Sequence, residues 1–134
     1  MAQTEVSSIV TRRRDLEYLI SRRQLQPSDY YTYIQYEVNL FKLYRIRVGK
    51  HHDPTLIQQQ RHVEALMIRH ISYVFERAIR RFPSEVDIWM DYISFLKDSG
   101  STTLLSNVLG KAIALYPKSE TFWSLAAVSV CVLC

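Results

Sequence analysis

Four histidines are the first side chains in this chain that could hold a metal ion. His51 and His52 lie next to Asp53 in a polar stretch. His62 and His70 fall in a separate helical pattern, in which a spacing of eight would allow them to share one face. Zinc requires three or four ligands at matched spacing, which these residues do not offer. We therefore predict loop and surface histidines, with no metal site and no cofactor.

Cys131 and Cys134 form a C-x-x-C spacing at the C-terminal end of the chain. A single pair is at most half a zinc site, and no βαβ pattern of a redox motif surrounds it. The same residues fit a prenylation box, but no polybasic run precedes them. We expect two small apolar residues in a frayed last helix. The lack of a disulfide framework also indicates a reducing compartment, and residues 1–10 lack the apolar core of a signal peptide.

Paired carboxylates could act in general acid–base catalysis. Asp15 and Glu17 form one pair, and Asp87 and Asp91 form another. Both pairs fall on expected helix faces with basic residues nearby in sequence, and nothing predicts a cleft that would raise their pKa values. The three glycines stand alone, so the sequence contains no glycine-rich phosphate loop. The sequence predicts a protein that is not an enzyme and has no small-molecule substrate.

Runs of arginine are the strongest candidates for a functional surface. Residues 1–83 hold 14 Lys and Arg against 8 Asp and Glu, whereas residues 84–134 hold 3 against 5. A basic surface can bind a polyanion such as RNA. The candidate contacts to RNA or to a partner protein are Arg12, Arg13, Arg14, Arg22, Arg23, Arg45, Arg47 and Lys50.

These basic candidates differ in how well a purely structural role explains them. Basic residues near a helix C-terminus offset the helix dipole, which is sufficient for residues 45–50. The helix dipole does not explain the arginine triplet at 12–14, because the triplet lies in the middle of an expected helix. The triplet could equally meet an acidic protein surface. Tyr31 and Tyr44 lie among or beside these charges and are candidates to stack on unpaired bases.

The elements that must position these residues are helices. Only 3 glycines and 4 prolines occur in 134 residues, of which 48% are apolar. Helical spacing of apolar residues predicts helices over about 5–24, 28–48, 55–82 and 85–97, from 101 or 103 to 116, and from 120 onward. The expected caps are Ser28 or Asp29, Ser84, Ser119 and, as a helix stop, Gly100. No apolar stretch is long enough to span a bilayer.

Part of the chain repeats itself with a period of 34 residues. The period is marked by Val74, Ala78, Pro83 and Trp89, which recur as Val108, Ala112, Pro117 and Trp123. A period of this size indicates stacked helix pairs, in which aromatic rings fill the space between crossing helices. The residues expected to hold the repeats together are Tyr30, Tyr33, Glu37, Ala78, Pro83, Trp89, Tyr92, Ala112, Pro117 and Trp123.

The repeat resembles the HAT (half-a-tetratricopeptide) repeat, whose first helix carries Trp or Tyr, a Tyr three residues later and a Glu seven residues later. Tyr30, Tyr33 and Glu37 fit this pattern, and in the next repeat Leu96 stands in place of the Glu. The Glu-Arg-Ala run at 76–78 fits the second helix. The resemblance implies an all-α, right-handed helical-repeat solenoid with a leading helix and about two and a half helix pairs.

The expected organisation is one domain over residues 1–134. It begins with a leading helix at 5–26, followed by a first HAT-like repeat at 28–83. A second repeat at 84–117 and a truncated third repeat at 118–134 complete it.

Within HAT proteins, the N-terminal part is similar to the U3 small nucleolar RNA-associated protein 6 family. The residues that carry this resemblance are Arg14-Asp15-Leu16-Glu17-Tyr18, Arg22-Arg23 and Tyr33-Ile34-Gln35-Tyr36-Glu37-Val38-Asn39-Leu40. It covers roughly residues 5–127 and is closest at 12–40. Members of the family are longer, so the chain resembles an N-terminal piece, from a truncated gene model or a short isoform. The apolar residues 128–134 depart from the repeat.

The resemblance implies a non-catalytic scaffold in the small-subunit processome, in the nucleus and nucleolus. Such a protein supports pre-rRNA processing that depends on the U3 small nucleolar ribonucleoprotein (snoRNP), and thereby 18S rRNA maturation. Its partners would be other processome proteins and the U3 snoRNP, with direct snoRNA or pre-rRNA contact as a candidate. No membrane partner is expected.

Two alternatives use a similar helical fold for another role. One is a HAT-repeat subunit of the pre-mRNA splicing or 3′-end cleavage machinery, against which the run at 33–40 argues. The other is a tetratricopeptide-type adaptor that takes a short peptide in its groove. The adaptor would need a polar, asparagine-rich concave face, whereas the candidate faces here are aromatic.

Overall fold

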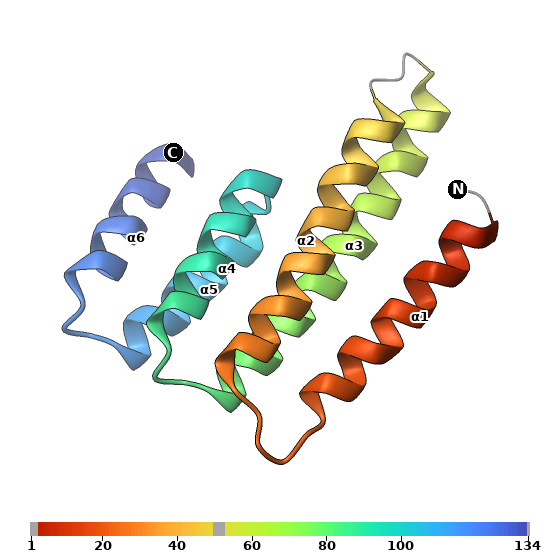
Figure 1. The fold of residues 1–134 in the computed structure, drawn as a ribbon. Helices are drawn as coiled ribbons and strands as arrows, with labels where there is room; N and C mark the ends of the chain where they lie inside the picture. The colour runs from red at the N-terminus through yellow and green to blue at the C-terminus, as the bar shows by residue number, and fades with distance from the viewer. Residues whose placement is uncertain (1–2, 50–52, 134) are drawn as a thin grey trace. The chain divides into compact units, whose positions relative to one another are not determined.

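The structure of the chain is a computed structural model that describes residues 3–49 and 53–133, with residues 129–133 described by their backbone alone. Every regular element in these ranges is an α-helix, which confirms the all-α prediction. The helices are α1 (Gln3–Ile20), α2 (Pro27–Val48), α3 (Pro54–Arg81), α4 (Val86–Ser99), α5 (Thr102–Leu115) and α6 (Glu120–Leu133) (Figure 1). None of these helices is both long and apolar enough to cross a membrane.

The chain divides into two compact units. Unit 1 is residues 1–83 and contains α1, α2 and α3. Unit 2 is residues 84–134 and contains α4, α5 and α6.

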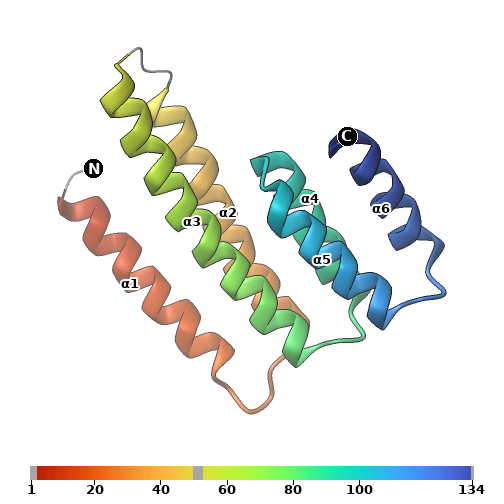
Figure 2. The same cartoon turned by 180° about the vertical axis from the view of Figure 1, so that it is seen from behind.

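In unit 1, α2 and α3 lie side by side and α1 packs against α2 (Figure 2). The last turn of α1, the first turn of α2 and the last turn of α3 lie at the same end of the unit (Figure 1). The apolar core of this unit consists of Leu16, Ile20, Leu25, Tyr30, Tyr33, Ile34, Phe41, Ile71, Val74, Phe75 and Ala78. At the shared end, the ring of Tyr30 meets that of Phe82 edge-on, with centroids 6.1 Å apart.

The connection between α1 and α2 corrects two predicted helix ends. The helix expected to run to residue 24 ends at Ile20, and Ser21 closes a turn by donating from N and Oγ to the carbonyl of Tyr18. The next helix starts at Pro27, one residue before the predicted start. Proline is suited to a first helical position because the amide it lacks would have no partner there. The N-cap is therefore Gln26, whose amide donates to Asp29 Oδ2 at 3.0 Å, and neither Ser28 nor Asp29 is the cap.

The remaining helix ends show one further correction. The N-cap of α4 is Glu85 and not the predicted Ser84. The helix stop at Gly100 is confirmed: its φ of 74° and ψ of 20° lie in the left-handed region, which glycine enters without a Cβ penalty. The N-cap of α3 is Asp53, whose Oδ1 accepts from the amide of Thr55 at 2.9 Å.

Unit 2 is built around an aromatic cluster. Trp89 of α4 meets Tyr116 and Phe122 edge-on, with ring centroids 6.5 and 6.4 Å away, and Tyr116 and Phe122 are 5.7 Å apart. Phe122 is fully buried, whereas Trp123 is 52% exposed and donates its indole N–H to the carbonyl of Pro117. The prediction that Trp123 packs the repeat is therefore corrected, because on this turn of α6 the neighbouring Phe122 faces the core.

Candidate nucleic-acid interface

The arginine triplet predicted as a contact surface is divided by an internal ion pair. Arg13 donates from Nε to Glu37 Oε1 at 2.7 Å and from NH2 to Glu37 Oε2 at 2.9 Å. Glu37 is 1% exposed. A paired guanidinium and carboxylate in this fork geometry form one of the stronger charged hydrogen bonds in proteins. Arg13 therefore joins α1 to α2, which is a structural role for a residue predicted as a candidate contact to RNA or a partner.

A second polar cluster joins α1 to both other helices of unit 1. Tyr33 donates its hydroxyl hydrogen to Glu17 Oε1 at 2.7 Å. Arg77 NH1 donates to both Glu17 oxygens, at 2.9 and 3.0 Å. One carboxylate on α1 thus accepts from a tyrosine on α2 and an arginine on α3.

The pKa shifts in these clusters are those of paired groups. Burial raises the pKa of Glu37, but the nearby His70 and the two hydrogen bonds from Arg13 outweigh it and leave that pKa below the usual value. Burial likewise raises the pKa of Glu17, and the hydrogen bonds from Arg77 and Tyr33 bring it below its usual value. For Tyr33, burial and the bond to Glu17 both raise the pKa. Both carboxylates are therefore ionised at neutral pH and hold helices together.

His70 lies beside the first of these clusters. Its Nε2 is 3.5 Å from Glu37 Oε1, a long contact next to the two short ones from Arg13. His62 lies on the same helix with an exposed side chain. No group of three or more metal-ligating side chains occurs among the residues that the structure describes. His51, His52, Cys134 and the side chain of Cys131 lie outside them.

The other basic candidates separate into paired and unpaired residues. Arg47 pairs with Glu5 at 3.0 Å, and Arg45 lies 3.7 Å from Glu64 and over the ring of Phe41. These intramolecular contacts agree with the structural role that is sufficient for Arg45 and Arg47, and Lys50 lies outside the described residues.

The unpaired arginines of the predicted set lie on α1 and in the turn that follows it. Arg12 is exposed and lies 5.9 Å above the ring of Tyr36. Arg14, Arg22 and Arg23 are exposed and have no acidic partner among the described residues. Because α1 ends at Ile20, the last two lie in the turn and not on the predicted helix.

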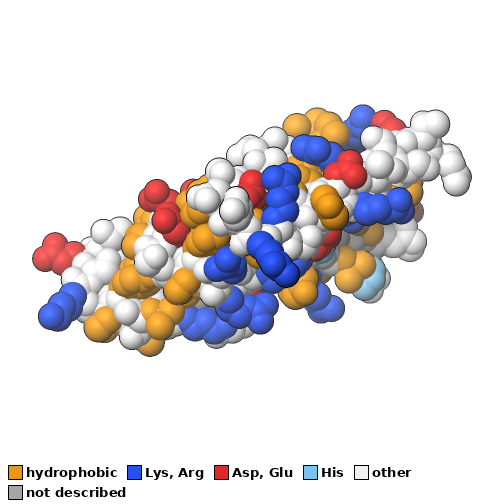
Figure 3. All heavy atoms as spheres, turned by 60° about the horizontal axis from the view of Figure 1, so that its bottom comes forward, with side chains coloured by type: hydrophobic (Ala, Val, Ile, Leu, Met, Phe, Trp, Pro, Cys, Tyr) orange, Lys and Arg blue, Asp and Glu red, His pale blue; other side chains and the backbone are white. Residues whose placement is uncertain are grey.

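Sequence reasoning missed the contribution of α3 to this basic surface. Arg80 and Arg81 occupy the last turn of α3, at the end of unit 1 where Arg22 and Arg23 also lie. Figure 3 brings this end forward and shows Lys and Arg side chains close together. The signal for Arg80 and Arg81 was present in the sequence as a basic helix C-terminus, but only the fold places it beside the turn after α1.

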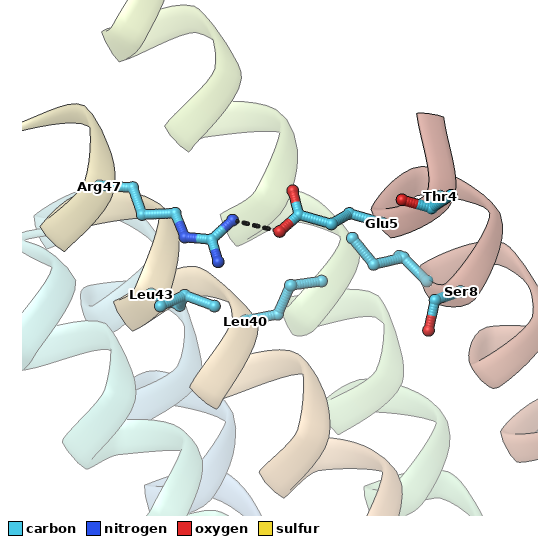
Figure 4. A pocket seen from close by; sticks show the side chains of 7 residues that line it. Thr4, Glu5, Ser8, Leu40, Leu43 and Arg47 are labelled. Atoms are coloured by element: carbon cyan, nitrogen blue, oxygen red, sulfur yellow. Dashed lines mark hydrogen bonds and ion pairs between the residues drawn. The ribbon is translucent and has the colours of Figure 1, made fainter. Parts of the chain in front are cut away.

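At the opposite end, α1 and α2 border a small, open, mainly apolar pocket. Its volume is about 310 Å³, and its lining is Thr4, Glu5, Ser8, Ile9, Leu40, Leu43 and Arg47. Figure 4 shows the ion pair between Arg47 and Glu5 reaching across the space between the two helices. The pocket contains one acid and one base, already paired with each other, so its lining offers no catalytic arrangement.

Comparison with known proteins gives one consistent result. The model of the family described as U3 small nucleolar RNA-associated protein 6 matches residues 1–72. The U3 small nucleolar RNA-associated protein 6 homolog of Homo sapiens is 30% identical over 129 residues, which are 94% of this chain and 21% of the relative. The protein of that name from Schizosaccharomyces pombe is 27% identical over 122 residues, covering 91% and 24%. The chain thus spans about a fifth of the length of the curated relatives it matches.

Proposed function

The chain belongs to the U3 small nucleolar RNA-associated protein 6 family, and we propose that it serves as a non-catalytic scaffold in the small-subunit processome. In this role it supports U3 snoRNP-dependent pre-rRNA processing and 18S rRNA maturation in the nucleolus. Its partners are other processome proteins and the U3 snoRNP. The names of its relatives, which state an association with U3 small nucleolar RNA, support this proposal.

The observation that supports the scaffold role is that charged groups of unit 1 join its helices to one another. Glu37 and Glu17 are held in hydrogen bonds that join α1, α2 and α3. A catalytic carboxylate needs an accessible reacting partner and a pKa near the working pH, whereas both of these pKa values are lowered by pairing. Ion pairs of this kind fix the relative positions of helices, which is what a docking surface requires.

We further propose that the helices form a right-handed HAT-type solenoid. Its parts are a leading helix, two repeats that end near Pro83 and Pro117, and the beginning of a third. In support, Tyr30, Tyr33 and Ala78 are buried in unit 1, and the corresponding Trp89, Tyr92 and Ala112 are buried in unit 2. Each unit thus buries these three repeat residues.

Affinity purification tests the assignment. The tagged chain is expressed in cells, recovered from nuclear extract, and its bound proteins are identified by mass spectrometry, with U3 RNA measured in the same eluate. Recovery of small-subunit processome proteins together with U3 RNA is expected. Recovery of splicing or 3′-end cleavage factors in their place would contradict the proposal and favour the alternative assembly.

A folding-defective variant provides the matched control for this purification. Ala78 is fully buried between helices, so Ala78→Glu places a charge where it has no partner. Proteins that this variant captures as well as the wild type does are non-specific. Depletion of the full-length protein in cells, followed by rescue and measurement of mature 18S rRNA against the large-subunit rRNA, then tests the processing role itself.

A further inference from the structure

We propose that unit 1 binds unpaired RNA on a face formed by α1 and α3, where Tyr18 and Tyr73 stack on bases and neighbouring arginines contact phosphates. This inference rests on the proposed function, because it names the RNA-contacting surface of the scaffold. The residues of this tyrosine–arginine face are Arg14, Tyr18, Arg22, Arg23, Arg69, Tyr73, Arg77 and Arg80.

Tyr18 is the first stacking position. Its side chain is 76% exposed, although a tyrosine ring gains stability from burial. Arg14 lies one helical turn earlier on α1, and Arg22 and Arg23 follow in the turn after the helix. All three arginines are exposed and without an acidic partner in the described part of the chain. An exposed ring therefore stands between unpaired positive charges.

Tyr73 repeats this arrangement on α3. It is 54% exposed, with Arg69 four residues before it and Arg77 four residues after it, on the same helix face. The guanidinium of Arg77 lies 5.2 Å from the centre of the Tyr73 ring, which orients the ring and places positive charge against it. Arg80, seven residues after Tyr73, continues the face and is exposed.

An ion pair links α1 and α3, the two helices that carry the stacking positions. Arg77, which contacts the Tyr73 ring, also donates to both oxygens of Glu17, the residue next to Tyr18. Seen from behind, α1 and α3 lie next to each other in unit 1 (Figure 2). The pairing also neutralises Glu17, so this carboxylate does not oppose an approaching phosphate. Asp15 and Glu76, the remaining acids of these turns, are outnumbered by the arginines.

The chemistry of this face favours unpaired RNA over other polyanions. Bases in single strands can stack on aromatic rings, whereas the bases of a duplex are stacked on each other and present only their edges. An acidic protein surface would use the arginines but has no need of two exposed tyrosine rings. The predicted stacking residues, Tyr31 and Tyr44, are half-buried. Tyr18 and Tyr73 therefore replace them.

Fluorescence anisotropy with the purified 134-residue chain tests the inference. The probe is a labelled oligouridylate of about ten nucleotides, within the range of typical single-strand sites, and an RNA duplex of the same length is the comparison. Tyr18→Ala and Tyr73→Ala are each expected to weaken binding by roughly tenfold, as the loss of one stacked base does. Arg22→Gln and Arg80→Gln are each expected to lower the dependence of log K on log salt by about 0.7, the loss of one phosphate contact.

Matched variants separate stacking from charge and from folding. Tyr18→Phe with Tyr73→Phe keeps both rings and is expected to bind like the wild type. Ile46→Ala removes a comparably exposed apolar side chain on α2 and is expected to have no effect. The variant that combines Tyr18→Ala with Tyr73→Ala tests the stacking role directly. If its circular dichroism spectrum is unchanged and it still binds oligouridylate like the wild type, the stacking role is overturned. Equal binding of a labelled polyglutamate peptide would also overturn it, in favour of an acidic protein partner.

The result is independent of the affinity purification that tests the proposed function. If processome proteins are recovered but oligouridylate does not bind, the further inference fails and the scaffold assignment remains. If oligouridylate binds through both tyrosines but processome proteins are not recovered, this RNA face is supported and the assignment to that assembly fails.

Discussion

Equivalent positions of units 1 and 2 solve the same packing problem with opposite chemistry. Tyr33 and Tyr92 occupy the same place in the repeat pattern, and both are 1% exposed. Four residues later, unit 1 has Glu37 and unit 2 has Leu96, and both are again buried. Glu37 is tolerated because Arg13 reaches it from α1 with two hydrogen bonds. Leu96 needs no partner.

The difference teaches what the leading helix contributes. In unit 1, Arg13 of α1 joins this helix to α2, and Glu17 of α1 joins it to α2 and α3, all through charged hydrogen bonds. In unit 2, the contact among α4, α5 and α6 is mainly apolar, around the cluster of Trp89, Tyr116 and Phe122. Unit 1 should therefore respond to loss of charge and unit 2 to loss of apolar volume.

The largest expected effect comes from giving unit 2 the residue of unit 1. Leu96→Glu buries a carboxylate without an arginine and should lower the free energy of unfolding of unit 2 by about 4 kcal/mol or more. Urea unfolding followed by tryptophan fluorescence measures this, because Trp89 and Trp123 both lie in unit 2. Lys97→Glu, at the exposed next position, is the control and should change the value by less than about 0.5 kcal/mol. A similar effect of both variants would break the comparison.

The aromatic cluster of unit 2 should respond next most strongly. Phe122→Ala removes a fully buried ring and should destabilise the unit by about 3 kcal/mol, as other buried Phe→Ala changes do. Trp123→Ala removes a half-exposed ring and one hydrogen bond to Pro117, and should lose about 1 kcal/mol or less. Urea unfolding followed by circular dichroism compares the two variants. The reverse order would show that Trp123 is the packing residue after all.

Removing the buried carboxylate of unit 1 should have a smaller effect. Glu37→Ala leaves Arg13 half-buried and unpaired, which should lower the free energy of unfolding by about 2 kcal/mol. Replacing both partners, as Glu37→Leu with Arg13→Leu, should recover most of this loss and make unit 1 resemble unit 2. Urea unfolding by circular dichroism distinguishes these cases. Glu64→Ala is the control, since its contact with Arg45 is 3.7 Å long and the Arg45 side chain is 42% exposed.

The smallest expected effect is a difference in acid sensitivity. The pKa values of Glu37 and Glu17 are lower in the folded state than in the unfolded chain. Their stabilisation is therefore complete above the unfolded pKa, near about 4.5, and is lost as the pH falls through the folded pKa. In unit 2, burial and, to a smaller extent, the neighbouring Asp87 raise the pKa of Asp91. Acidification should therefore affect the contribution of Asp91 to stability in the opposite direction.

Urea unfolding at neutral and at acid pH measures this last effect. Circular dichroism should show a loss of about 1 kcal/mol on acidification that tryptophan fluorescence from unit 2 does not show. The variant Glu17→Gln with Glu37→Gln should remove the difference between the two signals. An equal acid response in both signals would mean that the ion pairs of unit 1 contribute little.

The helices of this fold could be predicted because their signals are local. Apolar spacing indicated all of them, and Gly100 indicated a helix end with the left-handed conformation it adopts. The caps at Gln26 and Glu85 could not be predicted, because Ser28 and Ser84 are better cap formers and only the turn geometry excludes them.

The candidate site was harder to predict because its contacts are distant in sequence. The triplet at 12–14 is predicted to meet RNA or an acidic protein surface, but the acid that Arg13 meets is Glu37 of the same unit, 24 residues away in the sequence. Glu17 and Arg77 are 60 residues apart and carry no common motif. The exposure of Tyr18 and Tyr73 depends on which helix faces are covered, which spacing alone does not establish.

The fork between Arg13 and Glu37 also has a consequence for the descent of the family. A mutation that removes either side chain alone gives a destabilised protein. Positions 13 and 37 should therefore change together between related genes. Position 96, filled by a leucine that has no charged partner, is free to drift among apolar residues by itself. Positions 13 and 37 should therefore show coevolution in the family, and position 96 should show none.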